Sequence, residues 1–343
     1  MAPNKKVRVM VVDDSMLARS LIIKGLSANP GIEVVGYAIN TMDARNKFAQ
    51  LRPDVMTMDV EMPGMSGIDF LKQFLPEHPV PVVLVSSLNL RVFDALSAGA
   101  VDFLRKPEKD KTETFIEALT QKVLMAAHAK VRIAPSAAET AAPSAALGAH
   151  ASLDNVIIGL GASTGGTEAT LEVMKGLPAD IPGMVIVQHM PPGFTKMYAD
   201  RLNRLCSMEV REAKSGDEIH RGLALIAPAD FQTKIVRIGN RYTVSCGFAE
   251  RVSGHRPSVD VLFRSMADNV TCKMVGIIMT GMGQDGADGL LAMRRRGAYT
   301  IGQDEESSVV YGMPGVAKKI GAVTIQASCS NIAQVLMRHL KTL

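Results

Sequence analysis

The sequence of 343 residues has few cysteines, no tryptophan and no long apolar run. No stretch reaches the roughly 18 apolar residues that a membrane span needs, and the first residues lack the pattern of a secretory signal. The cysteines form no CxxC pair, which argues against a zinc site and a disulfide framework. We expect a cytoplasmic, soluble protein without membrane insertion. Its plain thiols should be mostly buried: Cys206, Cys246, Cys272 and Cys329.

The sequence also lacks a concentration of positive charge, although its net charge is +4. Residues 1–128 carry 15 basic and 15 acidic side chains, and the excess is spread over the rest of the chain. A nucleic-acid-binding domain usually gathers Lys and Arg on one face or stripe. We therefore expect no nucleic-acid partner, and a DNA-binding regulator would also need a helix-turn-helix domain that the sequence does not show.

Residues 129–152 are rich in Ala, Pro and Ser and hold few large apolar side chains. Such a segment cannot bury enough surface to offset the entropy lost on ordering. The composition predicts a linker over 129–152, between one domain at 1–128 and another at 153–343.

Both domains show the pattern of α/β proteins with a doubly wound sheet. Apolar runs that alternate with helical stretches are typical of parallel strands covered on both faces. In the first domain the runs predict a five-stranded, flavodoxin-like parallel sheet: 7–12, 32–38, 54–60, 80–87 and 101–104. In the second they predict a mainly parallel sheet: 155–161, 183–189, 273–280 and 322–326. The segment 234–245 contains Gly239-Asn240 between β-rich runs, which predicts a short antiparallel hairpin.

Polar residues lie at or just after the carboxyl ends of predicted strands in the first domain, where function gathers in open parallel sheets. They are Asp13, Asp14, Asp59, Ser86 and Lys106. Three convergent carboxylates suit a hard cation such as Mg²⁺. Beside that ion one aspartate could accept a phosphoryl group, and the lysine and serine could bind the phosphate oxygens. Helix capping is the simpler alternative, but it accounts for only one of these residues.

The segments VVDDS, MDVEMPGMSG, VSS and RKP, in this order, resemble the receiver domain of two-component response regulators over about residues 6–126. The resemblance implies that Asp59 is the phosphoacceptor, with Ser86, Lys106 and Phe103 sensing the phosphate. It further implies that Mg²⁺ is held by Asp14, Asp59 and the Glu61 backbone carbonyl, with Asp13 assisting.

The first strand of the second domain runs into Gly-Ala-Ser163-Thr164-Gly-Gly and a helical stretch. A strand, a tight glycine turn and a helix together project a serine hydroxyl above a sheet. A dinucleotide-binding loop is the alternative, but Thr164 stands at the third glycine position of that fingerprint. The next strand ends in Gln188-His189, where the fingerprint would place an acidic residue, so the nicotinamide alternative is disfavoured.

His189 ends a neighbouring strand and is our candidate for the base that takes the serine proton. His255 is a competitor that could instead serve substrate binding or structure. Asp285 lies in a glycine-rich loop after another strand and could orient the imidazole. Asp288 qualifies by type, but we prefer Asp285 because Asp288 falls in the first turn of the next helix. The Gly281–Gly283 backbone could direct an amide at an oxyanion.

The segments GASTGG, VIVQHMPPGFT, GHRPSVDVLF and TGMGQDGADGL are similar to the catalytic domain of the CheB family of chemotaxis protein-glutamate methylesterases. The resemblance implies Ser163 as nucleophile, His189 as base, Asp285 as orienting acid and the Met282 backbone amide as oxyanion donor, without a cofactor in this domain. It also implies methyl-accepting chemoreceptors as substrates, whose glutamate γ-methyl esters are hydrolysed to methanol and whose glutamines are deamidated. A chemotaxis histidine kinase would donate the phosphate, and the protein would be recruited to receptor clusters.

The family usually has a histidine near Gln232, and this departure could alter a loop that faces substrate. The leading interpretation is an esterase activated by phosphorylation and serving chemotaxis adaptation. A catalytically silent module that docks on receptors remains the alternative. We expect control by physical cover of Ser163, with recruitment to receptors as the other possibility.

Overall fold

The computed structural model describes residues 5–86, 91–107, 111–131 and 151–343, except for the side chains of 151 and 152. The backbone divides into two compact units, Met1–Ser136 and Ala137–Leu343. Most of the predicted linker lies outside the described residues, so its extent stays a prediction. Within the described ranges, no helix has both the length and the apolar character required to cross a bilayer.

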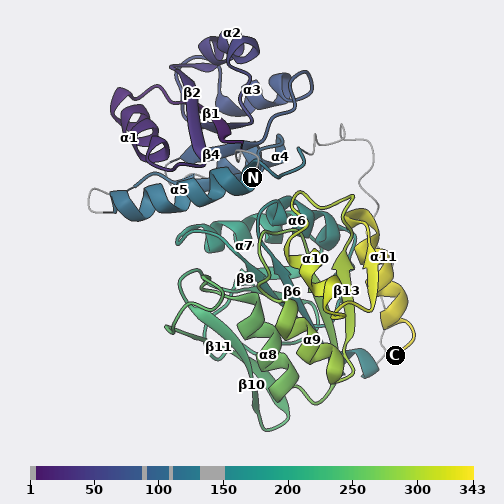
Figure 1. Ribbon diagram of the computed structural model, residues 1–343. Helices are drawn as coiled ribbons and strands as arrows, with labels where there is room; N and C mark the ends of the chain where they lie inside the picture. Colours follow the sequence, from purple (N-terminus) through teal and green to yellow (C-terminus); the bar gives the residue numbers. More distant parts are fainter. Residues whose placement is uncertain (1–4, 87–90, 108–110, 132–150) are drawn as a thin grey trace. The chain divides into compact units, whose positions relative to one another are not determined.

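In the described part of the first unit, five parallel strands form a sheet of order β2-β1-β3-β4-β5. This is the flavodoxin-like order and confirms the predicted fold. Helices cover both faces of the sheet, with α1 beside α5 on one of them (Figure 1). The strands are β1 Val7–Val12, β2 Ile32–Ala38, β3 Val55–Met58, β4 Val82–Ser86 and β5 Asp102–Arg105. The helices are α1 Met16–Ser27, α2 Thr41–Leu51, α3 Gly67–Phe74, α4 Arg91–Ser97 and α5 Thr112–Ala126.

Local chemistry accounts for where the helices of the first unit begin. The side chains of Ser15, Asn40 and Ser66 accept hydrogen bonds from backbone N–H groups three residues later. These caps satisfy N–H groups that lack partners within a helix. The caps come after β1, β2 and β3, so the chain turns from strand to helix at the carboxyl edge of the sheet.

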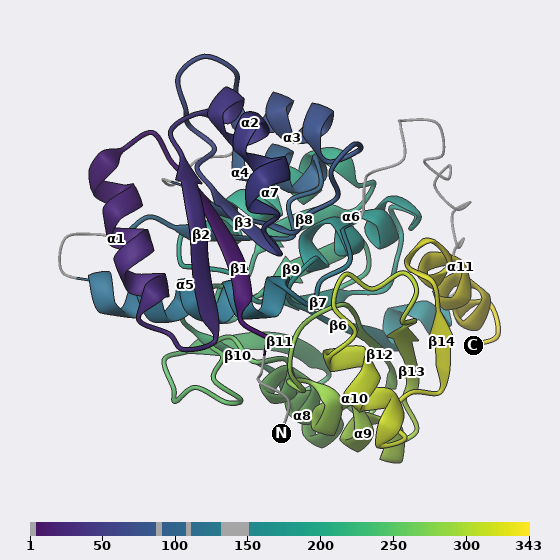
Figure 2. The ribbon, with the colours of Figure 1, turned by 45° about the horizontal axis from the view of Figure 1, so that its top comes forward.

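The described part of the second unit contains a seven-stranded parallel sheet of order β14-β13-β12-β6-β7-β9-β8. Its strands are β6 Val156–Ala162, β7 Met184–Gln188, β8 Glu209–Glu212, β9 Leu223–Ile226, β12 Lys273–Ile278, β13 Tyr299–Gln303 and β14 Ile325–Ala327. The helices are α6 Gly166–Lys175, α7 Phe194–Leu205, α8 Val259–Asn269, α9 Ala287–Arg295, α10 Met313–Lys319 and α11 Cys329–Leu340, after the 3₁₀ helix η1 Ala151–Asn155. Figure 2 shows the central strands of this sheet between the helices.

The predicted hairpin is present as β10 Gln232–Ile238 paired with β11 Arg241–Gly247. Ile238 pairs with Arg241 across a two-residue turn, and Gly239 has a φ of 60°. A positive φ at the first central position is what a type II′ turn requires, which explains the glycine. The hairpin packs on α8 and so supports the helix that will matter for the site.

Three features of the second unit differ from the sequence prediction. Strands β8, β9 and β13 were not predicted, because their runs are short or mix polar with apolar residues. The strand predicted at 322–326 is wrong in its bounds, since β14 begins only at Ile325. The cysteines are free as expected, but Cys329 alone is buried and the other three are partly buried.

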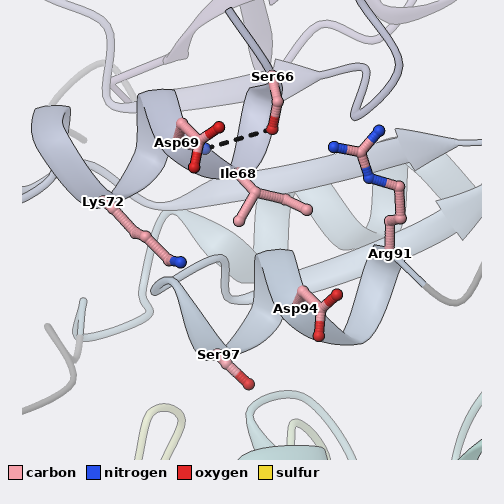
Figure 3. A pocket seen from close by; sticks show the side chains of 7 residues that line it. All are labelled: Ser66, Ile68, Asp69, Lys72, Arg91, Asp94 and Ser97. Carbon is pink, nitrogen blue, oxygen red and sulfur yellow. Dashed lines mark hydrogen bonds between the residues drawn. The ribbon is translucent and has the colours of Figure 1, made fainter. Parts of the chain in front are cut away.

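The first unit contains a cavity of about 320 Å³ between α3 and α4 (Figure 3). It is lined by Ser66, Ile68, Asp69, Lys72, Arg91, Asp94 and Ser97. Two acidic and two basic side chains leave this lining without net charge. Its lining includes none of the predicted site residues, which lie instead where the parallel strands end.

Candidate functional site

The first unit brings the predicted carboxylates together at the ends of β1 and β3. Asp13, Asp14 and Asp59 each place a carboxylate oxygen within 4.8 Å of the others. Asp13 and Asp59 are buried, whereas Asp14 is exposed. Burial raises the pKa of Asp13; Lys106 opposes this effect, while the charge of Asp59 adds to it. A cluster of this kind can bind a cation from the exposed side.

Lys106 partly neutralises the cluster. Its Nζ lies 2.5 Å from Asp59 Oδ2 and 3.2 Å from Asp13 Oδ2. Burial would lower the pKa of Lys106, but the hydrogen bond to Asp59 and the nearby carboxylate charges raise it above its ordinary value. Three carboxylates and one ammonium leave two negative charges. Oxygen ligands with this balance fit a divalent hard cation such as Mg²⁺.

The predicted phosphate-sensing residues lie on the neighbouring strands. Lys106 N–H donates to the Ser86 carbonyl at 2.8 Å, so both residues belong to the same sheet edge. Ser86 Oγ is buried and has no hydrogen-bond partner among the described residues, which leaves its hydrogen-bonding capacity for a phosphate oxygen. Phe103 is buried with its ring centroid 6.2 Å from that of Phe93 in α4. Glu61 N–H donates to Asp59 Oδ1 at 3.0 Å, and the role of its carbonyl stays a prediction.

In the second unit, Ser163 lies at the turn between β6 and α6. Its N–H donates to the Thr280 carbonyl at 2.9 Å. Its carbonyl accepts hydrogen bonds from Gly166 N at 2.7 Å and from Gln188 Nε2 at 2.8 Å. A Cβ at Gly166 would lie 2.4 Å from Gln188 Oε1, so this close approach requires glycine. The turn that carries the serine is therefore held from both neighbouring strands.

Register places Ser163 beside His189. Ala162 pairs with Gln188 across β6 and β7, and His189 N–H donates to the Ala162 carbonyl at 3.1 Å. Strand β12 lies on the other side of β6 and leads into the loop that contains Asp285. The connection from β6 runs to β7, whereas the connection from β12 runs to β13 on the other side, so the topological switch point lies between β6 and β12. The three candidates follow β6 and its two neighbours, beside this point where α/β proteins bind ligands.

Asp285 contacts His189 directly, with Oδ2 2.9 Å from Nε2. The buried carboxylate also accepts hydrogen bonds from Ser258 Oγ at 2.6 Å, Val259 N at 2.8 Å and Asp260 N at 3.1 Å. Burial would raise the pKa of Asp285, but the hydrogen bond and charge of His189, together with Ser258 and Val259, hold it below its ordinary value. Asp285 is therefore an ionised partner for the imidazole.

The alternatives from the sequence have other surroundings. Asp288 lies in the first turn of α9, is exposed, and lies 3.4 Å from Arg264. The His255 ring stacks on His189 with centroids 3.7 Å apart and planes 10° apart, so it is a neighbour of the candidate base. His189 Nδ1 is buried and has no hydrogen-bond partner in the described part of the chain. The structure thus brings Asp285 rather than Asp288 to the imidazole.

Ser258 and Gln232 support the site in a way that sequence reasoning missed. Gln232 is buried in β10, and its Nε2 donates to the carbonyls of Glu250 and His255. Its Oε1 accepts from Ser258 N at 2.8 Å. It therefore lies beneath the loop before α8 rather than facing solvent. Ser258 immediately before the VDVLF run is a helix N-cap signal that could have drawn attention to it.

Both units match families of known proteins. Residues 158–336 match the family described as CheB methylesterase, and residues 9–120 match the response regulator receiver domain. The chain is 45% identical over 99% of its length to protein-glutamate methylesterase/protein-glutamine glutaminase 2 of Syntrophomonas wolfei, which is also covered to 99%. It is 47% identical to the protein-glutamate methylesterase/protein-glutamine glutaminase of Syntrophotalea carbinolica, with 96% of each chain covered.

A solved structure extends the comparison to three dimensions. The CheB methylesterase catalytic domain of Thermotoga maritima matches with a TM-score of 0.52 and 33% identity, over 53% of this chain and 97% of that one. The matched families, the near full-length relatives and the shared catalytic-domain fold point to one assignment. This chain belongs to the CheB methylesterase family, with a response regulator receiver domain before its catalytic domain.

Proposed function

We propose that this chain hydrolyses glutamate γ-methyl esters on chemoreceptors, releases methanol, and so serves chemotaxis adaptation. Deamidation of receptor glutamines is the matching second activity, since an amide can follow the same acyl-transfer route. The observation that carries the proposal is the contact between His189 and Asp285 beside the Ser163 turn. A serine, an imidazole and an oriented carboxylate are the groups that acyl transfer requires.

The chemistry proceeds in two stages. His189 takes the proton from Ser163 Oγ, and Oγ bonds to the ester carbonyl carbon to give a tetrahedral oxyanion. The Met282 N–H stabilises that oxyanion. The carbon–oxygen bond to the methoxy group then breaks, and His189 protonates the leaving methanol. Water attacks the acyl-enzyme with His189 again as base, which frees the glutamate carboxylate and returns the proton to Ser163.

Asp285 sets the imidazole tautomer for these steps. Because its ionised carboxylate lies against Nε2, the proton of the neutral ring resides on Nε2. The lone pair is then on Nδ1, the buried nitrogen without a described partner. Asp285 also stabilises the imidazolium that forms when the serine proton is taken.

In the first unit we assign phosphate acceptance to Asp59, with a chemotaxis histidine kinase as donor. Mg²⁺ bound by Asp13, Asp14, Asp59 and the Glu61 carbonyl would neutralise charge on the phosphoryl oxygens during transfer. Lys106 and Ser86 would hold those oxygens afterwards, and Phe103 would respond to the movement of Ser86. The phosphorylated protein would then act at receptor clusters in the cytoplasm.

Methanol release from membranes with methylated receptors tests the proposal. Wild-type protein should release methanol, and Ser163→Ala should lose about four orders of magnitude or more in rate while remaining folded. Receptor binding without methanol release by the wild type would favour a docking scaffold. Retention of a tenth of the wild-type rate by Ser163→Ala would remove the serine from the nucleophile role.

A further inference from the structure

We propose that segment 310–313 fixes the orientation of the Gly281–Met282 peptide, and that Gly312 is the positioning residue that makes this possible. The inference rests on the proposed esterase function, in which the Met282 N–H donates a hydrogen bond to the oxyanion. It assigns the pre-organisation of that donor to a segment some 30 residues further along the chain, which follows β13 and ends at the first residue of α10.

The hydrogen bonds at Gly281 set the direction of the Met282 N–H. The Gly281 carbonyl accepts from Gly312 N at 3.1 Å and from Met313 N at 2.8 Å. A trans peptide is planar, so the Met282 N–H points away from the Gly281 carbonyl. The donors that bind the carbonyl therefore prevent the peptide from rotating and turning its N–H away.

The same peptide lies against the nucleophile turn. A Cβ at Gly281 would lie 2.7 Å from Ser163 Cβ and 3.2 Å from Ser163 N. Ser163 N–H also donates to the carbonyl of Thr280, the preceding residue. The oriented N–H thus belongs to the residue next to the one that touches the serine. It therefore lies close to where the substrate carbonyl oxygen becomes an oxyanion after Ser163 Oγ has bonded to the carbonyl carbon.

Thr280 ties the segment to the serine turn. Its hydroxyl donates to the Thr164 carbonyl at 3.0 Å and accepts from Val310 N at 3.0 Å. Gly281 N–H donates back to the Val310 carbonyl at 3.0 Å. Thr280 is fully buried, so these hydrogen bonds do not exchange readily with water. The nucleophile turn and the segment that orients Met282 therefore share one anchor.

Gly312 is required by close contact rather than by an unusual backbone. Its φ of −90° and ψ of −75° keep it out of the positive-φ region that favours glycine. A Cβ there would lie 2.7 Å from the Gly281 oxygen, 2.9 Å from Gly283 N and 3.1 Å from Met282 Cα. These are backbone atoms of the oxyanion loop, so a methyl group must displace the loop itself.

Gly312→Ala tests the inference in the full-length protein. We expect kcat for methanol release to fall about 10²–10³-fold, the loss seen when an oxyanion donor is removed, with little change in KM. A boronic acid analogue of the glutamyl ester, which forms a tetrahedral adduct with serine, should lose affinity by a similar factor. The carboxylate product peptide should bind as before. A merely structural effect would not separate these two ligands.

Gly176→Ala is the matched control. Gly176 also has a negative φ, −78°, and a Cβ there would lie 2.9 Å from Ala333 Cβ, in the contact between α6 and α11. It should lose stability and keep kcat. A Gly312→Ala enzyme whose kcat stays within about twofold of wild type would overturn the inference, as would equal kcat losses in both variants.

A second pair of variants covers the case in which Gly312→Ala does not fold. Thr280→Val removes the hydroxyl that anchors Val310 and should lower kcat and boronate affinity together, whereas Thr280→Ser keeps the hydroxyl and should restore both. Equal activity in all three Thr280 forms would again overturn the inference. Wild-type protein that neither releases methanol nor binds the boronate would instead overturn the proposed function, and the inference with it.

Discussion

The two units place an aspartate at the same point of a parallel sheet and surround it differently. Asp59 follows β3, and Asp285 lies in the loop after β12. Asp59 lies among carboxylates with Lys106 as the neighbouring cation. Asp285 accepts hydrogen bonds from His189, Ser258, Val259 and Asp260. Asp59 also accepts hydrogen bonds from Glu61 N–H and Lys106 Nζ, but the carboxylates around it leave a surplus of negative charge. Asp285 is satisfied by protein donors, with an imidazole beside it.

This difference separates two kinds of chemistry that one architecture can support. Surplus negative charge favours binding of a divalent cation, and an aspartate beside that cation can accept a phosphoryl group. A carboxylate satisfied by protein donors has no need of a cation and stays ionised, which is what orientation of an imidazole requires. The fold supplies the position, and the immediate neighbours determine the use.

The largest expected effect concerns phosphorylation at Asp59, the aspartate that lies among carboxylates. Incubation with a small phosphodonor and Mg²⁺ should label the wild-type protein, and chelation of the metal should abolish the label. Asp59→Asn should carry no label, because the nucleophilic carboxylate is gone. Asp69→Asn, an exposed change in the first turn of α3, is the control and should label normally. Label that persists in Asp59→Asn would place the acceptor elsewhere.

The next largest effect concerns Asp285, the aspartate that contacts the imidazole. Asp285→Asn should lower kcat by about 10⁴-fold, because an amide can hold the wrong imidazole tautomer and cannot balance the imidazolium charge. Asp288→Asn is the control. Its exposed carboxylate lies 3.4 Å from Arg264. A surface change of this kind usually alters the free energy of unfolding by under about 0.5 kcal/mol, so Asp288→Asn should keep its kcat. A larger loss in Asp288→Asn than in Asp285→Asn would show that the wrong carboxylate was assigned.

The sequence predicted more of the first unit than of the second. Strands β1 and β2 match their predicted runs residue for residue, because both runs are rich in β-branched residues, which favour strands even where a charged residue interrupts the run. Strand β8, Glu-Val-Arg-Glu at the sheet edge, has no such run. The contacts of Ser258 with Asp285 and of Gln232 with Ser258 were not predicted, for a different reason. These contacts join residues 26 or 27 positions apart, and no local pattern records such pairings.

A smaller effect concerns control of one unit by the other. If the first unit covers Ser163 before phosphorylation, a fragment of residues 152–343 should be active without phosphodonor. It should release methanol about a hundredfold faster than the unphosphorylated whole protein, because a free-energy difference of a few kcal/mol between the covered and open states allows a change of that size. Methanol release from both proteins gives the comparison, with circular dichroism to establish that the fragment is folded. A folded fragment that is no faster would reject cover and favour recruitment to receptors.

The smallest expected effect concerns a single donor to Asp285. Ser258→Ala removes the hydroxyl that lies 2.6 Å from this carboxylate and should lower the free energy of unfolding by about 1–3 kcal/mol at pH 7. It should also lower kcat about tenfold if about 1.4 kcal/mol of that support reaches the transition state. Denaturant titration and methanol release measure the two quantities.

The pH dependence identifies the source of the Ser258 effect. The folded-state pKa of Asp285 lies below the ordinary value of 3.8, so its stabilising contribution is complete above that value and is lost as the pH falls through the folded pKa. The stability difference between wild type and Ser258→Ala should therefore narrow on acidification below about pH 4. Ser265 is the control, and it lies in α8, the helix that Ser258 caps. Among the described residues its Oγ bonds only neutral backbone groups, Ile235 N and the Leu262 carbonyl. Ser265→Ala should lower the free energy of unfolding by the same amount at pH 7 and below about pH 4. If Ser258→Ala behaves in the same way, the charged carboxylate is not what its hydroxyl stabilises, and the contrast between Asp59 and Asp285 weakens.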